Sequence, residues 1–333
     1  MLMTDIIKAV LKPVLKRVLV LLSYGVASAA LLAAQPIDSQ IIDNPASAPL
    51  SLAAQAAPDA AHDDIRQAYF TPIASKQALV CHLSALTQCI GLLPQSLQQQ
   101  LAFSASHIRR ALGRKSAMVL VAEHDIIAGV IIVNPAQDRD EQSGSIGLTT
   151  YRLALVKQAQ LTLWHEIGHL YNISLQDSIL PSSLSQYQHE WLADLYLLWR
   201  IAQHYQQLDL AWQQFHRRNL ALINDSGNLS HWSSPQLQIV LSRFDVQQLQ
   251  HFTRYDDFLT AVYPLMPTWS RRDMGEFSSL IQRTFGAGVV QSLPRYMFWR
   301  QPKLIEVLSP TLEQLMGKAE TQHWFKNQFS SAK

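Results

Sequence analysis

The chain has 333 residues, of which 48% are hydrophobic and 16% are charged, and its formal net charge is +2. This composition predicts a globular protein with a substantial core and excludes a largely disordered chain. The net charge is small, and no basic run interleaved with aromatic residues follows the N-terminus, so the sequence indicates no nucleic-acid partner.

The N-terminal segment, residues 1–34, has the parts of a signal peptide. An apolar run at 18–34 contains the small residues Ala27-Ser28-Ala29, which suit a cleavage site. Four cations precede this run: Lys8, Lys12, Lys16 and Arg17. The run also reaches the short limit for a membrane-spanning helix, so an uncleaved membrane anchor is the alternative, and a buried N-terminal helix is a third. Either kind of export segment predicts an exported protein, periplasmic or tethered to the membrane on its outer side.

A composition rich in Ala, Pro, Ser and Gln predicts a flexible linker at 35–60, followed by a folded domain at 61–333. The two cysteines, Cys81 and Cys89, have no CxxC spacing and so do not indicate a metal site. On one straight helix they would lie too far apart to bond, so a disulfide requires a bend near Gly91 or Pro94. Two buried free thiols are the alternative.

Further along the chain, the pattern from Asp63 to about Leu112 is mainly helical. Two β-branched runs, Met118–Glu123 and Ile126–Val133, predict a hairpin, and a third short strand is expected within 143–150. Helical periodicity then dominates from about 153 to 325. The expected fold class is α+β and mostly helical, with a small antiparallel sheet, one helix packed against it and a helical C-terminal half.

The segment Leu161–Asn172, LTLWHEIGHLYN, is an apolar helix that carries three ionisable residues. His165 and His169 are four apart and share one face of the helix, so both imidazoles can reach one metal ion. Glu166 is rotated by about 100° from His165, where it can reach a water at that ion without being a ligand. This is the HExxH pattern of zinc sites in which the glutamate is the general base.

A second helix is predicted to start at Ser185, which forms an S-x-x-Q capping box with Gln188. Within it, Glu190 and Asp194 are four apart and surrounded by large apolar residues, where two like charges need a cation. A zinc ion bound to two imidazoles is such a cation. Glu190 is then the third protein ligand, and Asp194 accepts the outer N–H of a ligating histidine.

The pair of motifs, HEIGH and the downstream E-x-x-A-D, resembles the gluzincin metallopeptidases. The resemblance covers His165 to Asp194 and implies that His165, His169 and Glu190 bind Zn²⁺, with Glu166 as the general base. It also implies a zincin core at 61–225 with a helical C-terminal part at 226–333, and a peptide or protein as substrate. A strand near Ser145–Thr150 would pair with that peptide.

Two assignments have alternatives in the sequence. His189 lies next to Glu190 but points about 100° away on the helix, so it is a poorer third ligand. His231, in a polar break between helices, is the candidate donor to the oxyanion of the reaction, with Tyr255 and Tyr263 as alternatives.

The rival functions are a non-catalytic envelope binding protein stabilised by zinc and a membrane-tethered helical scaffold without metal. A purely structural site has no need of a base such as Glu166 beside its first ligand, which favours the peptidase.

Overall fold

The structure, a computed structural model, describes residues 68–286 and 298–330. All of these residues belong to one unit, Ala61–Lys333. The predicted signal peptide or anchor (1–34) and the predicted linker (35–60) lie outside the described residues. Within the described ranges, no helix combines the length and the apolar character that crossing a bilayer requires.

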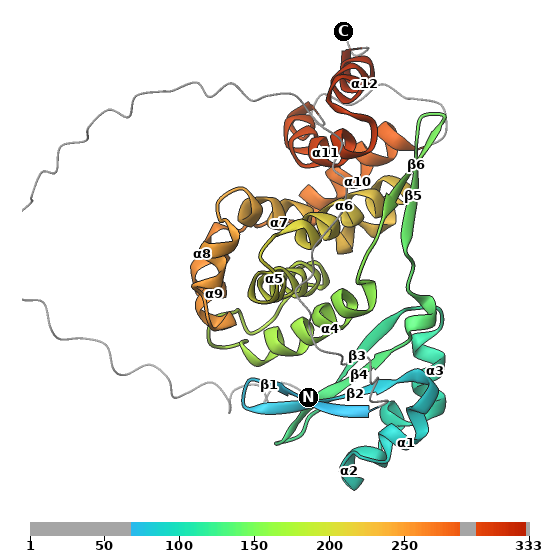
Figure 1. Cartoon of the computed structure of the whole chain (residues 1–333), viewed down its shortest axis with the longest axis vertical. Coiled ribbons are helices and arrows are strands. Elements are labelled where there is room, and N and C mark those ends of the chain that lie inside the picture. Colours follow the sequence, from blue (N-terminus) through green and yellow to red (C-terminus); the bar gives the residue numbers. More distant parts are fainter. Residues whose placement is uncertain (1–67, 287–297, 331–333) are drawn as a thin grey trace, which may run out of the picture. The chain divides into compact units, whose positions relative to one another are not determined.

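The described chain forms two small β-sheets and a series of helices that fills most of its C-terminal half (Figure 1). The strands are β1 (Ala68–Ile73), β2 (Lys76–His82), β3 (Ala117–Val121), β4 (Ile127–Val133), β5 (Glu141–Ile146) and β6 (Thr149–Ala154). The helices are α1 (Leu86–Ile90), α2 (Gln95–Gln98), α3 (Ala105–Leu112), α4 (Gln158–Ser174), α5 (Gln186–His204), α6 (Asp209–Asn224), α7 (Ser234–Leu241), α8 (Val246–Gln250), α9 (Tyr255–Val262), α10 (Arg271–Phe285), α11 (Gln301–Met316) and α12 (Lys318–Ser330). The expected α+β, mostly helical fold class is confirmed.

The larger sheet has the strand order β1-β2-β4-β3, which leaves β3 at one edge. The predicted hairpin is present, because β3 and β4 pair antiparallel. The sheet as a whole is mixed and not antiparallel as expected, since β2 and β4 run parallel. The chain between these two strands contains α1 to α3 and β3, which gives the long crossover that a parallel pair requires.

The region from Asp63 to about Leu112 was expected to be mainly helical. The expectation holds for α1 to α3, and it was wrong for the first two strands, β1 and β2. The chain reverses between them at Ala74, whose φ of 50° is rare for a residue other than glycine. Side chains from alternate positions of β2 lie in two separate hydrophobic clusters, Ala78 and Val80 in one and Leu79 and Cys81 in the other. A strand that is buried on both faces reads as a continuous apolar run, without the alternation that identifies a half-buried strand.

The single strand expected within 143–150 is a hairpin of its own, β5 and β6. Its turn includes Gly147, with φ of 61°, a conformation that favours glycine. This hairpin is a separate two-stranded sheet, in which β5 contacts α6 and β6 contacts α11 (Figure 1).

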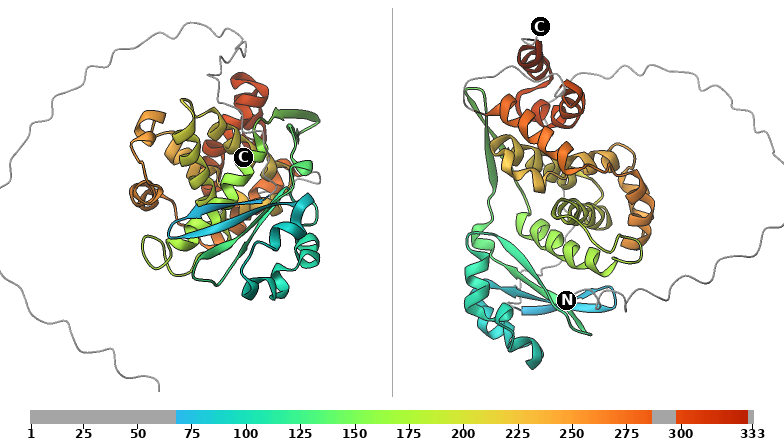
Figure 2. Two further views of the ribbon diagram at one scale, coloured as in Figure 1. Left: turned by 60° about the horizontal axis from the view of Figure 1, so that its bottom comes forward. Right: turned by 180° about the vertical axis from the view of Figure 1, so that it is seen from behind.

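Helix α4 lies against one face of the larger sheet, and the helices α1 to α3 cover the other face (Figure 2). Gly129 of β4 allows the close approach of α4, because a Cβ at this position would lie 2.8 Å from Leu170 Cδ2. Helix α5 packs along α4 on the side away from the sheet, and α6 and α7 follow. The main hydrophobic core is continuous from the sheet to α11 and α12 and so crosses residue 225, where the zincin core was expected to end.

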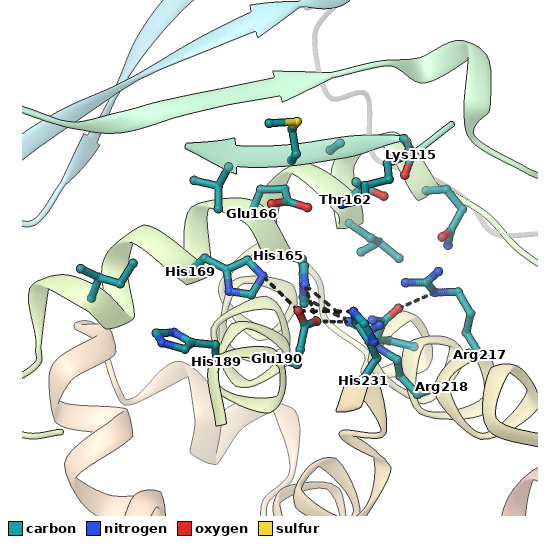
Figure 3. A pocket seen from close by; sticks show the side chains of 18 residues that line it. Lys115, Thr162, His165, Glu166, His169, His189, Glu190, Arg217, Arg218 and His231 are labelled. Carbon is teal, nitrogen blue, oxygen red and sulfur yellow. Dashed lines mark hydrogen bonds and ion pairs between the residues drawn. The ribbon is translucent and has the colours of Figure 1, made fainter. Parts of the chain in front are cut away.

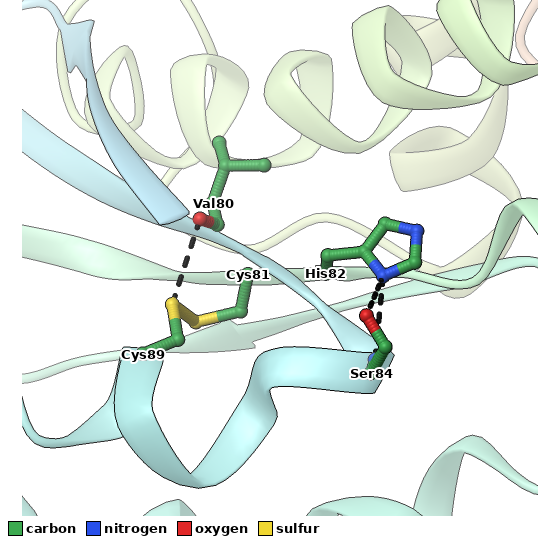
Figure 4. The surroundings of a disulfide bond; sticks show 5 residues. All are labelled: Val80, Cys81, His82, Ser84 and Cys89. Carbon is green, nitrogen blue, oxygen red and sulfur yellow. Dashed lines mark hydrogen bonds between the residues drawn. A yellow bond between two sulfur atoms is a disulfide. The ribbon is translucent and has the colours of Figure 1, made fainter. Parts of the chain in front are cut away.

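Cys81 of β2 and Cys89 of α1 form a disulfide with a Cα–Cα distance of 5.7 Å (Figure 4). The sequence left this pairing open. The bend that permits it lies at the short 3-10 helix η1 (Leu83–Ala85), between the strand and the helix. It does not lie near Gly91 or Pro94, because the two cysteines never share a helix.

Candidate metal centre

Helix α4 presents both histidines of the HExxH motif to the same point. The rings of His165 and His169 are 4.7 Å apart between centroids, and both side chains are almost buried. Helix α4 contains no Asp, Glu, Lys, Arg or His other than the three residues of the motif.

Helix α5 brings Glu190 to these two rings (Figure 3). The helix begins as predicted, because the Ser185 hydroxyl accepts a hydrogen bond from the Gln188 backbone N–H and the Gln188 side chain accepts one from the Ser185 N–H. One turn later, Glu190 Oε2 lies 3.4 Å from His165 Nε2, and Glu190 Oε1 lies 3.9 Å from His169 Nε2. One ligand atom from each of the three residues lies within 4.8 Å of the other two.

The two helices meet at Gly168 of α4 and Ala193 of α5. A Cβ on Gly168 would lie 2.9 Å from the Ala193 carbonyl oxygen and 2.9 Å from Tyr196 Cβ, closer than real Cβ atoms approach other atoms. Only glycine fits at this position of the motif without displacing α5. It lets α5 come close enough for Glu190 to reach the histidines.

Asp194 is completely buried one turn beyond Glu190. Its Oδ1 accepts a hydrogen bond from His165 Nδ1 at 2.8 Å, which leaves His165 Nε2 directed at Glu190. Gln214 Nε2 donates to the same oxygen at 2.9 Å, and the Ser233 hydroxyl donates to Oδ2. Asp194 thus orients His165 as the sequence predicted, and several donors hold Asp194 in turn.

Arg218 of α6 belongs to the same network and was not found from the sequence. Its Nε donates to Asp194 Oδ2 at 2.7 Å and its Nη2 to Asp194 Oδ1 at 3.1 Å, while Nη2 lies 3.8 Å from Glu190 Oε2. The one sequence signal for it is the pair Arg217-Arg218, which follows Phe215 and His216 in a segment of helical periodicity. Arg218 supplies a protein cation to both carboxylates, so their charge alone does not require a metal.

The charges in this network shift the pKa values of its members. Burial lowers the pKa of His165, but the charge of Asp194 and its hydrogen bond outweigh burial and raise that pKa to about 9. Burial and the neighbouring charge of His165 lower the pKa of His169 to about 3, so His169 is the neutral imidazole that a metal requires. Burial opposes ionisation of Glu190, yet its hydrogen bond to His165 and that ring's charge lower its pKa to about 2. A metal at His165 Nε2 therefore has to displace a proton.

The three residues line a cavity of about 570 Å³. Glu166 lines it on the side of the edge strand β3, and burial raises the pKa of its carboxyl group. His231, in the 3-10 helix η4 (Ser226–His231), also reaches this cavity, with Nε2 at 3.5 Å from Glu190 Oε1.

The other candidates do not reach the three ligand residues. His189 lines the cavity but is outside the group of residues that can share an ion. Tyr255 is buried and donates its hydroxyl to Asn172, and Tyr263 packs against Trp191; neither tyrosine lines this cavity.

The strand that borders the cavity differs from the expected one. Residues Lys115 to Val119, which lead into β3 and form its first part, line the cavity. The segment Ser145–Thr150, which was expected to pair with a peptide, lies in the β5–β6 hairpin and is not part of this wall. The sequence placed the edge strand wrongly because the strand order of a sheet depends on long-range pairing, which local pattern does not specify.

Comparison of the chain with protein-family models, with curated proteins and with solved structures found no match.

Proposed function

We propose that this protein is a zinc-dependent metallopeptidase of the cell envelope. The observation that carries the proposal is the meeting of His165, His169 and Glu190 on one cavity wall, beside the carboxyl group of Glu166. Two imidazoles and one carboxylate are the ligand set of catalytic zinc sites that leave one coordination position open.

The residues present fit a zinc ion. One oxygen of Glu190 lies 3.4 Å from His165 Nε2 and the other lies 3.9 Å from His169 Nε2, and one ligand atom from each residue lies within 4.8 Å of the other two. Ligand atoms about 2.1 Å from a tetrahedral ion lie roughly 3.4 Å apart, so a small side-chain adjustment would bring the three residues to that spacing. The hydrogen bond from His165 Nδ1 to Asp194 leaves Nε2 for the ion and fixes the orientation of the ring. When bound, Zn²⁺ would lower the pKa of a water molecule and polarise the carbonyl group of a substrate.

The remaining steps use side chains of the chain itself. Glu166 accepts a proton from the attacking water and delivers it to the leaving amine, and its raised pKa suits this exchange. His231 can donate from Nε2 to the developing oxyanion, since its other ring nitrogen lies 3.0 Å from Ser230 Oγ. The exposed edge of β3 offers main-chain groups to an extended peptide.

One observation favours a different function. The positive charge of Arg218 balances the negative charges of Asp194 and Glu190 without a metal. A helical scaffold with a buried polar network would require such a balance. In that scaffold Glu166, whose pKa burial raises, has no chemical role. Metal content separates this second candidate from the peptidase.

The proposal of export rests on the N-terminal segment 1–34 and is supported by the Cys81–Cys89 disulfide. Disulfides persist in oxidising compartments and are rare in the cytosol.

The test compares the purified full-length protein with its Glu166→Gln variant, in zinc content and in cleavage of casein. The peptidase predicts about one zinc per chain in both proteins and a loss of cleavage of roughly 100-fold or more in the variant. Glu123→Gln, at an exposed position away from the cavity, is the matched control and should leave both quantities unchanged.

Three results contradict the proposal in different ways. Absence of zinc supports the scaffold, and zinc without cleavage in the unaltered protein supports a non-catalytic binding protein. Equal cleavage by the Glu166→Gln variant removes Glu166 from the mechanism.

A further inference from the structure

A second cavity, of about 690 Å³, adjoins the cavity of the candidate metal centre. The two cavities share four lining residues, which are Ser116, Gln158, Thr162 and Arg217. The far wall of the second cavity is polar and includes residues 137–143 and part of α6. A ligand bound at the metal centre can therefore extend past the shared residues into the second cavity.

Arg217 lies at this junction, one residue before Arg218 on α6. Its Nε donates to Gln214 Oε1 at 2.9 Å, whereas neither Nη atom has a hydrogen-bond partner among residues 68–286 and 298–330. In the same ranges no carboxylate lies within 4.0 Å of its guanidinium. Figure 3 shows the side chain extending from α6 towards the interior of the first cavity. Arg218 forms an ion pair with Asp194, whereas the Nη atoms of Arg217 are available to bind a ligand.

Arg217 is only partly exposed, and it lines both cavities. Burial and the adjacent charge of Arg218 lower the pKa of Arg217 to about 10, so it is still charged at neutral pH. A second donor at the junction, Gln158 Nε2, is buried and also lacks a partner in the described part of the chain. A buried donor without an acceptor, such as Gln158 Nε2, destabilises a fold. An anion with two oxygens in one plane is the best partner for an arginine fork such as that of Arg217.

The charge of Asp194 acts more strongly on Arg217 than that of Asp138, but Asp194 is already bound by Arg218, and Asp138 is the next carboxylate. Burial raises the pKa of this carboxyl group, and the charge of Arg217 opposes that rise, so the two groups interact across the second cavity without an ion pair. Asp138 leaves the Nη atoms of Arg217 open.

We propose that Arg217, assisted by Gln158, binds a carboxylate group of the substrate at the junction of the two cavities. The identification of the ligand as a peptide rests on the proposed function. The carboxylate has two possible sources in a peptide, the C-terminus of the chain and an acidic side chain. In the first case the protein removes residues from the C-terminal end, and in the second it selects acidic sequences.

The test measures binding to the full-length protein after zinc has been removed with a chelator, so that no peptide is cleaved. Three probes are compared by calorimetry: pentaalanine with a free C-terminus, pentaalanine amide, and Ala-Ala-Glu-Ala-Ala amide. A carboxylate held by an arginine fork should bind about tenfold to a hundredfold more tightly than the neutral pentaalanine amide. Preference for the first probe identifies a C-terminus, and preference for the third identifies an acidic side chain.

Variants separate a binding role from a structural one. Arg217→Gln should remove the preference, and Arg217→Lys should keep only part of it. Arg110→Gln, at an exposed position of α3 that lines neither cavity, is the matched control and should keep the preference in full. Gln158→Leu removes a buried donor without a partner, so it should weaken the preference while leaving the protein folded.

Equal binding of all three probes, no measurable binding of any probe, or a full preference in Arg217→Gln overturns the proposal. The binding measurement contains no zinc, so its result does not depend on whether the protein is a zinc peptidase. The carboxylate proposal and the peptidase proposal can therefore fail separately. A carboxylate preference in a protein that never binds zinc would refute only the proposed function.

Discussion

Replacing Asp194 with asparagine tests whether the buried network beside the histidines is as tightly connected as the contacts indicate. The substitution keeps the shape of the side chain but removes its charge and turns one acceptor into a donor. If the amide nitrogen takes the place of Oδ2, then Arg218 Nε and Ser233 lose their acceptor. If it takes the place of Oδ1, then His165, Gln214 and Arg218 Nη2 lose theirs.

Either orientation leaves at least two donors facing another donor and leaves the guanidinium of Arg218 buried without its main counter-charge. Removing one partner of a buried ion pair costs about 3–5 kcal/mol. We therefore expect the free energy of unfolding of Asp194→Asn to fall by about 3–5 kcal/mol. This is a large part of the total stability of an ordinary domain, which is about 5–15 kcal/mol.

The assay is urea unfolding of the zinc-free full-length protein, followed by circular dichroism, with the unfolding free energy taken from the midpoint and slope. Asp256→Asn is the matched control, because Asp256 pairs with the exposed Arg254 at the surface. Such a pair contributes about 0–1 kcal/mol, so the control should change little. A loss below about 1 kcal/mol for Asp194→Asn would refute the network as described.

Three further predictions concern packing, the disulfide and pH. Gly168→Ala should lower the free energy of unfolding, measured in urea, by about 1–2 kcal/mol. The added methyl group overpacks against Ala193, and this cost exceeds the gain in helix propensity. A stabilised variant would contradict the close approach of α4 and α5. Replacing Cys81 and Cys89 together with alanine should lower the free energy of unfolding by about 2.5 kcal/mol, because the short loop closed by the disulfide is opened. Reducing the disulfide of the unaltered protein with dithiothreitol should cause an equal loss, and a different loss would show another cause. Burial lowers the pKa of His216 to about 4, so the folded state binds fewer protons than the unfolded state between about pH 4 and pH 6.5. Stability should then fall by up to about 3 kcal/mol as the pH decreases from 6.5 to 4, and His216→Gln should flatten this slope; equal slopes in both proteins would show that other groups cause it.

The local geometry of the two central helices could be predicted from the sequence. The spacing of His165 and His169 fixes their common face, and the capping box at Ser185 fixes where α5 begins. Gly168 and Ala193 are small residues, and both lie at the contact of α4 and α5. These features depend on helical periodicity and on side-chain size, which a sequence displays directly.

The sequence did not specify what depends on contacts between distant segments. Arg218 reaches Asp194 from a different helix, and nothing near either residue in the chain indicates that pairing. For the same reason the parallel pairing of β2 with β4 was not predicted. The error at β1 and β2 has a local cause as well, since the turn uses Ala74 at positive φ and so lacks the glycine or asparagine that signals a reversal.

The most direct test of the metal centre is the zinc stoichiometry of the full-length protein and of its Glu190→Gln variant, measured after dialysis against a limited zinc buffer. A joint site on α4 and α5 predicts about one zinc per chain, and a large loss of zinc in Glu190→Gln. Glu320→Gln, an exposed position on α12, should retain the metal. Full zinc retention by Glu190→Gln, or no zinc in the unaltered protein, would contradict the assignment of His165, His169 and Glu190 as a metal site.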